Sequence, residues 1–342
     1  MDLKSRRFES NKKYRAKLKA QKLQQLSSPS LSSQSFEVST ESVDDNLTTT
    51  STALPAAMPA MSTISLDMLI GDTADIQCNV QYVAHRDLNI ATFTYSPADQ
   101  SRVPKGYVIA IHGGPAFCHN YLLPLQLLVR DGYTVIFYDQ AGCGKSSFVT
   151  DPESEAPWLL SIQYYLDELQ EIINFFKLDR YFLYGSSWVW NNKLKLRMES
   201  IDADQLSWMF VCIQGTIVCQ EFAVKLPRGL LGLLLDGALS DAELYIRTQW
   251  RDRISTLPTL TQKLLKYCID NGDFSSPMYK ELNDTVSKHF TCRAIPSVAC
   301  YHESFAGMNP VIYTKMQGEC EFMIGGVLKN WSITDRYWIV QL

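Results

Sequence analysis

The feature that most restricts the fold is a series of short apolar segments separated by stretches long enough for helices. The runs Tyr107–Ile111, Thr134–Tyr138 and Tyr181–Tyr184 consist largely of apolar and aromatic residues, which is typical of strands covered on both faces. Leu122–Arg130 has the length of a crossover helix, and Leu166–Phe176 carries an apolar stripe at helical spacing. This order predicts a doubly wound, mostly parallel α/β sheet.

Two segments before these runs have a different pattern. Asp75–Val83 and Leu88–Tyr95 alternate apolar and polar side chains, as half-buried antiparallel strands do. Only a few residues separate them. They predict a hairpin that opens the fold.

The first 62 residues lack the composition of a folded domain. Residues 1–26 are rich in Lys and Arg, and residues 27–62 are rich in Ser, Thr, Pro and Ala. Neither stretch can bury a core, so residues 1–62 are predicted to form a disordered tail. The basic part is interpreted as a solvated tail, with a mitochondrial-type presequence or a nucleic-acid arm as alternatives. A start at Met58 or Met61 would remove it.

Composition narrows the class of partner. The chain of 342 residues has a net charge of −4 and a pI near 5.8, which gives no overall attraction for nucleic acid or an anionic membrane. No apolar run is long enough to span a bilayer, and the nine cysteines form no CxxC pair or His/Cys cluster. We therefore expect a cytoplasmic protein with reduced thiols and no metal or organic cofactor. It would act on peptides or small molecules, and its oligomeric state stays open.

A candidate nucleophile follows the third apolar run. Gly185-Ser186-Ser187-Trp188 matches the start of a nucleophile elbow, in which a serine is held on a sharp turn from strand to helix. Small neighbours are needed there because the strand and the helix lie close together. On its own this tetrapeptide is a weak signal.

Two further motifs follow the other apolar runs. His112-Gly113-Gly114-Pro115 comes directly after a strand, so its backbone N–H groups could form an oxyanion hole together with that of Trp188. The glycine-rich segment Asp139–Ser147 follows the next strand, near the edge of the sheet where such folds bind ligands. A phosphate-binding loop is excluded there, because the motif requires glycine where this chain has Asp139.

In this order the three motifs resemble those of the proline iminopeptidases, the S33 group of α/β-hydrolases. The resemblance continues through Leu226-Pro227 and the run Leu233–Gly237 and reaches about residue 336. It implies an α/β-hydrolase core at residues 63–238 and a helical cap at 239–330. Residues 331–342 would begin a C-terminal core segment that is incomplete.

The resemblance also implies roles for individual residues. Ser187 would be the nucleophile that forms an acyl-enzyme, with Gly113, Gly114 and Trp188 around the oxyanion. Acidic groups of the cap would hold the free amino end of a substrate whose first residue is released. Glu243 is the first candidate for such a group, although an exposed helical glutamate is the commoner role.

One internal segment departs from the family pattern. In the family the motif continues from Ser-Trp-Gly-Thr straight into a helix, whereas here Trp188 is followed by Val189 and the familiar pattern resumes at Gly215-Thr216. We interpret residues 189–214 as a non-family insertion and hypothesise that it is an intron retained in frame. A surface insertion is the alternative, but it places the β-branched Val189 where the turn favours glycine. The transcript sequence distinguishes the two.

A second departure concerns the partners of the nucleophile. In α/β-hydrolases an acid and then a histidine follow the serine, and here both are expected beyond the printed end, since His289 and His302 are placed in the cap by the resemblance. The printed chain is therefore expected to be impaired and poorly soluble. The rival interpretation is a non-catalytic α/β-hydrolase-like binding protein. A nucleic-acid module in the basic tail is a third and weaker one.

Overall fold

The structure is a computed structural model, and it describes residues 64–99, 101, 103–186, 214–290, 298–320 and 322–337. Chain contacts divide the protein into a unit of Met1–Ala57 and a unit of Met58–Leu342. All described residues lie in the second unit, to which the rest of this section refers.

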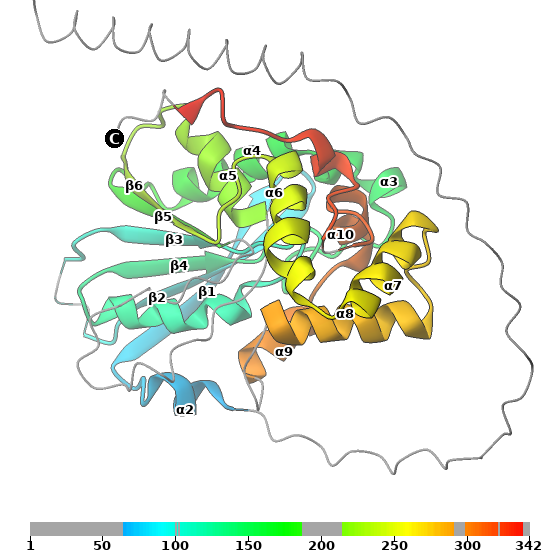
Figure 1. Cartoon of the computed structure of the whole chain (residues 1–342). Helices are drawn as coiled ribbons and strands as arrows, with labels where there is room; N and C mark the ends of the chain where they lie inside the picture. Colours follow the sequence, from blue (N-terminus) through cyan, green and yellow to red (C-terminus); the bar gives the residue numbers. More distant parts are fainter. Residues whose placement is uncertain are drawn as a thin grey trace, which may run out of the picture. The chain divides into compact units, whose positions relative to one another are not determined.

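A six-stranded sheet with the order β1-β2-β4-β3-β5-β6 forms the centre of this unit (Figure 1). β2 is antiparallel to both of its neighbours, β1 and β4, whereas β4, β3, β5 and β6 run parallel to one another. The strands are β1 (Ile76–His85), β2 (Leu88–Pro97), β3 (Tyr107–Ile111), β4 (Thr134–Tyr138), β5 (Tyr181–Ser186) and β6 (Leu230–Asp236). The predicted opening hairpin is confirmed as β1 and β2, which pair along their whole length.

Helices connect and follow these strands. Those that precede or connect the strands are α2 (Leu66–Ile70), η1 (His119–Val129), α3 (Pro152–Glu155), η2 (Pro157–Leu160), α4 (Ile162–Phe175) and α5 (Gln214–Ala223). After β6 come α6 (Ala242–Thr248), η3 (Gln249–Arg253), η4 (Ile254–Thr256), α7 (Thr259–Asp270), α8 (Pro277–Phe290), α9 (Ala299–Ala306), α10 (Pro310–Met316) and η5 (Val327–Asn330).

The crossover between β3 and β4 differs in type from the predicted helix. Residues 119–129 form a 3-10 helix that contains Pro124 and begins three residues earlier than expected. Proline has no backbone N–H to donate and its ring clashes with the preceding turn, so a regular α-helix is disfavoured there. The apolar face is still buried, through residues such as Leu122 and Val129.

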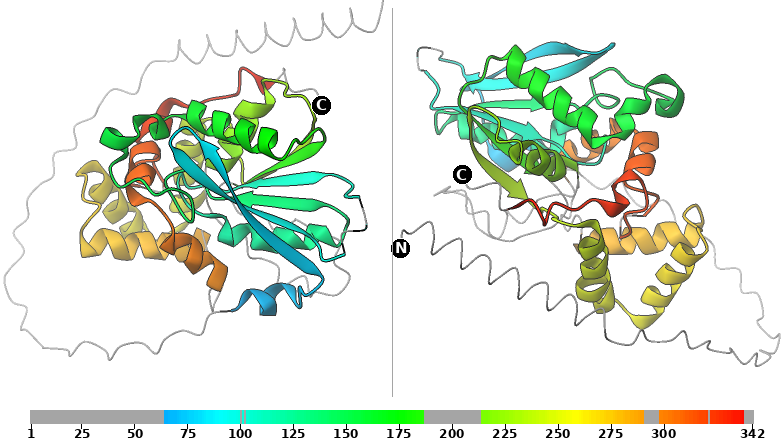
Figure 2. Two further views of the ribbon diagram at one scale, coloured as in Figure 1. Left: turned by 180° about the vertical axis from the view of Figure 1, so that it is seen from behind. Right: turned by 90° about the horizontal axis from the view of Figure 1, so that it is seen from above.

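Two separate cores lie on the two faces of the sheet, as a doubly wound fold requires. One contains side chains of α4 and α5, including Leu169 and Phe222. The other contains side chains of η1 and α9, including Tyr121 and Cys300. Both faces are seen to be covered in Figure 2. A third cluster, with Leu265 and Tyr279, holds the helices that follow β6 to one another.

Two kinds of feature are not found in the described part of the chain. None of its helices combines the length and the apolar character needed to cross a bilayer. Nor do three or more potential metal-ligating side chains come together there.

Candidate active site

The sequence motifs meet at the edge of the sheet where the parallel strands end. Ile111, the last residue of β3, lies opposite Tyr138 of β4 on one side and Gly185 of β5 on the other. The loops that follow these strands therefore start at the same level. Ser186 in turn lies opposite Asp236, the last residue of β6.

The predicted oxyanion loop has a backbone shape that only glycine fits. Gly114 has a φ of 129°, and a Cβ atom there would lie 2.6 Å from the nitrogen of Phe117 and 2.7 Å from that of Ala116. The Gly113 N–H donates to the Tyr121 hydroxyl at 2.9 Å. Gly114 is therefore the better placed of the two glycines to donate to an oxyanion, and Gly113 would have to give up its present partner.

The histidine of this motif is structural. His112 is fully buried, its Nδ1–H donates to the Gly113 carbonyl at 2.8 Å, and its Nε2 accepts the Gln140 N–H at 2.9 Å. The Gln140 amide donates back to the His112 carbonyl at 3.0 Å. Burial lowers the pKa of His112 to about 4, so the ring is neutral. It joins the loops after β3 and β4.

Asp139 organises the loop after β4. Its carboxylate accepts hydrogen bonds from the backbone N–H and the Nδ1–H of His119, at 2.9 and 2.8 Å, and from the Lys145 N–H at 2.8 Å. Burial raises the pKa of Asp139, but the hydrogen bonds and charge of His119 outweigh this effect and the pKa is lowered. The carboxylate is thus kept ionised inside the fold.

The segment after α9 attaches these loops to the helices that follow β6. The Asn309 N–H donates to the Ala116 carbonyl, and the Asn309 amide donates to the carbonyls of Gly142 and Val149, each at 2.8 Å. The Gly144 N–H donates to the Gly307 carbonyl at 2.9 Å. One asparagine therefore fixes both loops.

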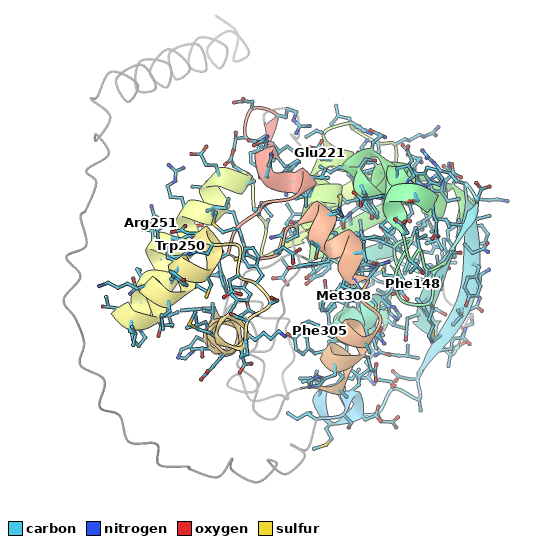
Figure 3. All side chains as sticks on the ribbon, turned by 90° about the vertical axis from the view of Figure 1, so that its right-hand side faces the viewer. Phe148, Glu221, Trp250, Arg251, Phe305 and Met308 are labelled. Carbon is cyan, nitrogen blue, oxygen red and sulfur yellow. The ribbon has the colours of Figure 1, made fainter. Side chains whose placement is uncertain are left out.

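Aromatic side chains stand beside the oxyanion loop. The rings of Phe117 and Phe305 pack edge to face with centroids 4.7 Å apart, and Tyr301 contacts the same Phe305 ring at 4.7 Å. Phe305, labelled on α9 in Figure 3, is 46% exposed. It can offer an apolar surface to a ligand next to Gly114.

The opposite side of the site contains a carboxyl group that the sequence reasoning did not single out. Asp236 accepts a hydrogen bond from the Tyr184 hydroxyl at 3.2 Å, and burial raises its pKa to about 6. The hydroxyl of Ser186, its neighbour on β5, is buried and has no hydrogen-bond partner in the part of the chain that the structure describes. The signal in the sequence was the position of Asp236 at the end of the apolar run that forms β6.

A second buried acid lies below these loops. Glu168 of α4 is fully buried and accepts the Ala141 N–H at 2.9 Å, while its other oxygen finds no partner among the residues described. Burial raises the pKa of Glu168 to about 8. The sequence signal was a glutamate within the apolar stripe of α4, next to Leu169.

The remaining predicted residues are placed as follows. Ser187 and Trp188 lie outside the described residues, as does most of the segment 189–214. Glu243 is exposed in the first turn of α6. The roles of all three side chains stay predictions.

All five histidines are among the described residues, and His85, His112 and His119 are held by contacts within the fold. His85 lies on β1 against the Tyr164 ring. His119 pairs with Asp139 and stacks on Phe93 of β2. In the sheet, β4 and β3 lie between β2 and β5, the strand that precedes Ser187. His289 and His302 are exposed on α8 and α9.

Comparison with known proteins agrees with this geometry. The proline iminopeptidase of Thermoplasma volcanium is 29% identical over 254 residues, 73% of this chain and 74% of the relative. That of Saccharolobus solfataricus is 29% identical over 231 residues, 67% of this chain and 64% of the relative. The chain thus spans about two thirds to three quarters of the length of these relatives. No family model matches the chain.

Solved structures give the same result. The proline iminopeptidase of Mycobacterium smegmatis has a TM-score of 0.63 and 26% identity, covering 77% of this chain and 79% of that one. VinJ has the same TM-score at 24% identity, which bears on the fold alone. The α/β-hydrolase fold and the resemblance to proline iminopeptidases are confirmed.

Proposed function

We propose that this α/β-hydrolase chain, a relative of the proline iminopeptidases, is a serine hydrolase of that type. It would release the first residue of a peptide, with proline favoured, or cleave an amino-acid amide or ester, through an acyl-enzyme on Ser187. One observation carries the proposal. Ile111 and Gly185 are neighbours in the sheet, so the Gly113-Gly114 loop and Ser187 follow adjacent strands at the same level.

The chemistry requires few groups beyond these. The Ser187 hydroxyl would attack the substrate carbonyl, while the N–H groups of Gly114 and Trp188 stabilise the charge that develops on the oxygen. Collapse of the tetrahedral intermediate would break the bond to the leaving amine, which takes up a proton. Water would then hydrolyse the acyl-enzyme and restore the hydroxyl. No metal or organic cofactor takes part.

Recognition of the first residue would use one acidic and one apolar surface. A free amino group is a cation at neutral pH, so it favours a carboxylate partner. Glu243 is our first candidate for that partner, and Asp236 is the alternative that lies nearer the nucleophile strand. The rings of Phe117 and Phe305 would contact a proline side chain.

The group that would accept the proton of the Ser187 hydroxyl is not identified in this chain. A serine hydroxyl without a base is a poor nucleophile. His112 and His119 are engaged with Gln140 and Asp139, and His289 and His302 are exposed on α8 and α9. We propose that the catalytic activity of this polypeptide is impaired for this reason. The same observation favours the second candidate function, a non-catalytic protein that binds a peptide or an amino-acid derivative at the same edge of the sheet. In either case we propose a cytoplasmic location.

A labelling experiment separates the two functions. The full chain is treated with a fluorophosphonate probe and assayed with prolyl naphthylamide, with and without imidazole as an external base. The hydrolase proposal expects slow labelling that imidazole accelerates, lost in Ser187→Ala and kept in Ser186→Ala, whose hydroxyl is buried. Labelling that ignores Ser187, or none with imidazole present, would favour the binding protein. An ordinary turnover rate without imidazole would overturn the proposed impairment.

A further inference from the structure

The sheet ends at β1 in a long strand whose outer edge is unpaired among the described residues. β1 is the first strand in the order of the sheet, and β2 is the one described strand that pairs with it. In Figure 3 the pale blue strand β1 lies at the right-hand margin of the described fold. Alternate residues of an edge strand direct their N–H and C=O groups away from their neighbour, so β1 can pair with a further strand.

The sequence of β1 does not oppose such pairing. Edge strands of soluble proteins are commonly short, or they carry charged residues or proline that discourage pairing with other chains. β1 spans 10 residues, Ile76–His85, without lysine, arginine, aspartate, glutamate, proline or glycine. It therefore has the length and the composition of a strand that pairs on both sides.

One face of β1 also exposes apolar side chains. Side chains at every second position share a face of a strand, and Cys78, Val80 and Tyr82 are all exposed on this one. Val80 is 46% exposed, whereas Phe93, its partner on β2, is 3% exposed and belongs to the core. The core on this side of the sheet thus ends between β2 and β1. A further strand beside β1 would cover the exposed side chains.

Symmetry and charge select one register for a pair of β1 strands. Hydrogen-bonded and non-bonded pairs alternate in an antiparallel ladder, so a two-fold axis must pass through a residue that lies opposite its own copy. Axes at Val80 and at Gln81 pair more of the strand than any other. With the axis at Gln81, Asp75 lies opposite Asp87, which is unfavourable. With the axis at Val80, Asp75 instead lies diagonally across from the exposed Arg86 of the second copy.

We propose that β1 is the interface of a homodimer, in which two copies pair antiparallel about Val80 and join their sheets into one. Val80 then packs on Val80 of the second copy, and Cys78 packs on Tyr82. On the other face, the Asn79 amide lies opposite the Gln81 amide. The partner is a second copy because this register brings apolar, polar and oppositely charged groups together with their like or complement. β1 is the edge strand farthest from β5 and β6, so the dimer leaves the candidate site accessible.

Sedimentation of the full chain over a range of concentrations tests for the dimer. We expect a dissociation constant below about 100 μM, as for a small interface. Val80→Lys would place two cations opposite each other and should raise this constant by at least about tenfold. Val103→Lys is the matched control, because Val103 is 92% exposed and lies outside the strands, and it should leave the constant unchanged.

Two outcomes of this measurement would overturn the proposal. One is a full chain that stays monomeric at every concentration. The other is a dimer that withstands Val80→Lys but dissociates in Leu231→Lys, since Leu231 is exposed on β6 at the opposite edge of the sheet.

Cysteine substitutions test the register in the same protein. In a Cys78→Ser background, Val80→Cys would face its own copy at a Cα separation of about 4.5–5.5 Å, which suits a disulfide. Ala84→Cys, exposed on the same face, would face Ile76 and lie about 25 Å from its own copy. Under mild oxidation we expect at least about tenfold more cross-linked dimer from Val80→Cys than from Ala84→Cys. Equal yields, or a higher yield from Ala84→Cys, would contradict the proposed pairing.

Discussion

The edge of the sheet that carries the candidate site has two unlike halves. The loops after β3 and β4 form one half, in which the polar side-chain atoms of His112 and Asp139 are engaged with backbone groups and with His119, although the Gln140 Oε1 has no partner among the described residues. The ends of β5 and β6 form the other half, where the Ser186 hydroxyl has no partner among the described residues and Asp236 has a raised pKa. The difference teaches that hydrogen bonds hold the titratable side chains His112 and Asp139 in the first half, whereas burial disfavours the charged form of Asp236 in the second.

The largest effect is expected in the first half. Asp139→Ala would leave the two buried N–H donors of His119 and the partly buried backbone N–H of Lys145 without an acceptor. We expect the free energy of unfolding to fall by about 3–5 kcal/mol, as when one partner of a buried polar pair is removed. Chemical denaturation measures it. Asp151→Ala, which removes an exposed helix cap, is the control at about 1 kcal/mol, and equal losses in both variants would contradict the account.

Glu168 contacts the first half through the Ala141 N–H, and its titration makes the stability of the fold depend on pH. Its pKa in the folded chain, about 8, is above the ordinary value of 4.5, so its contribution to stability is complete below pH 4.5 and is lost as the pH rises through 8. Glu168→Gln mimics the protonated form and can still accept the Ala141 N–H. We expect the variant to match the parent at pH 4.5 and to exceed it by about 2–4 kcal/mol at pH 9. Parallel stability curves would refute this.

Asp236 gives a smaller effect of the same sign in the second half. Burial raises its pKa from 3.8 to about 6, so stability is lost as the pH rises from about 4 to about 6 and stays constant above. Asp236→Asn keeps an acceptor for the Tyr184 hydroxyl. It should be more stable than the parent by about 2 kcal/mol at pH 7 and equal to it at pH 4 in thermal unfolding. A gain that is the same at both pH values would have another cause.

The smallest effect is a serine-to-alanine substitution in each half. The Ser146 hydroxyl accepts the Ala91 N–H at 2.8 Å and donates to the Asp139 carbonyl, so Ser146→Ala should cost about 1 kcal/mol. Ser186→Ala removes a hydroxyl that has no partner among the described residues and should be neutral or stabilising by up to about 1 kcal/mol. Denaturant midpoints measured side by side would show a loss of stability for Ser146→Ala and none for Ser186→Ala. Losses of the same size would mean that the two halves do not differ in this way.

Much of the first half could be predicted from the sequence. The apolar runs located β3 and β4, and His112-Gly113-Gly114-Pro115 indicated a loop directly after β3, in which Gly114 has no room for a Cβ atom. Each of these signals is local in the sequence, since it depends on residues within one strand and its loop. Local patterns are the ones that single-sequence reasoning detects.

The parts that escaped prediction depend on residues far apart in the chain. Asn309 joins two loops from more than a hundred positions away, and the pairing of Ser186 with Asp236 depends on the register of β6. No periodic pattern encodes such contacts. The 3-10 helix was also missed, because the length of the segment was weighed more than Pro124 within it.

The central claim is that Ser187 faces the Gly114 N–H across a space that a substrate carbonyl can enter. It is tested most directly by the distance from the Ser187 Oγ to the Gly114 nitrogen in a crystal structure of a variant that lacks residues 189–214. The account predicts a separation of at most about 6 Å, because one reacting group must lie about 3 Å from each. A hydroxyl turned into the sheet, or more than about 10 Å from that nitrogen, would contradict it.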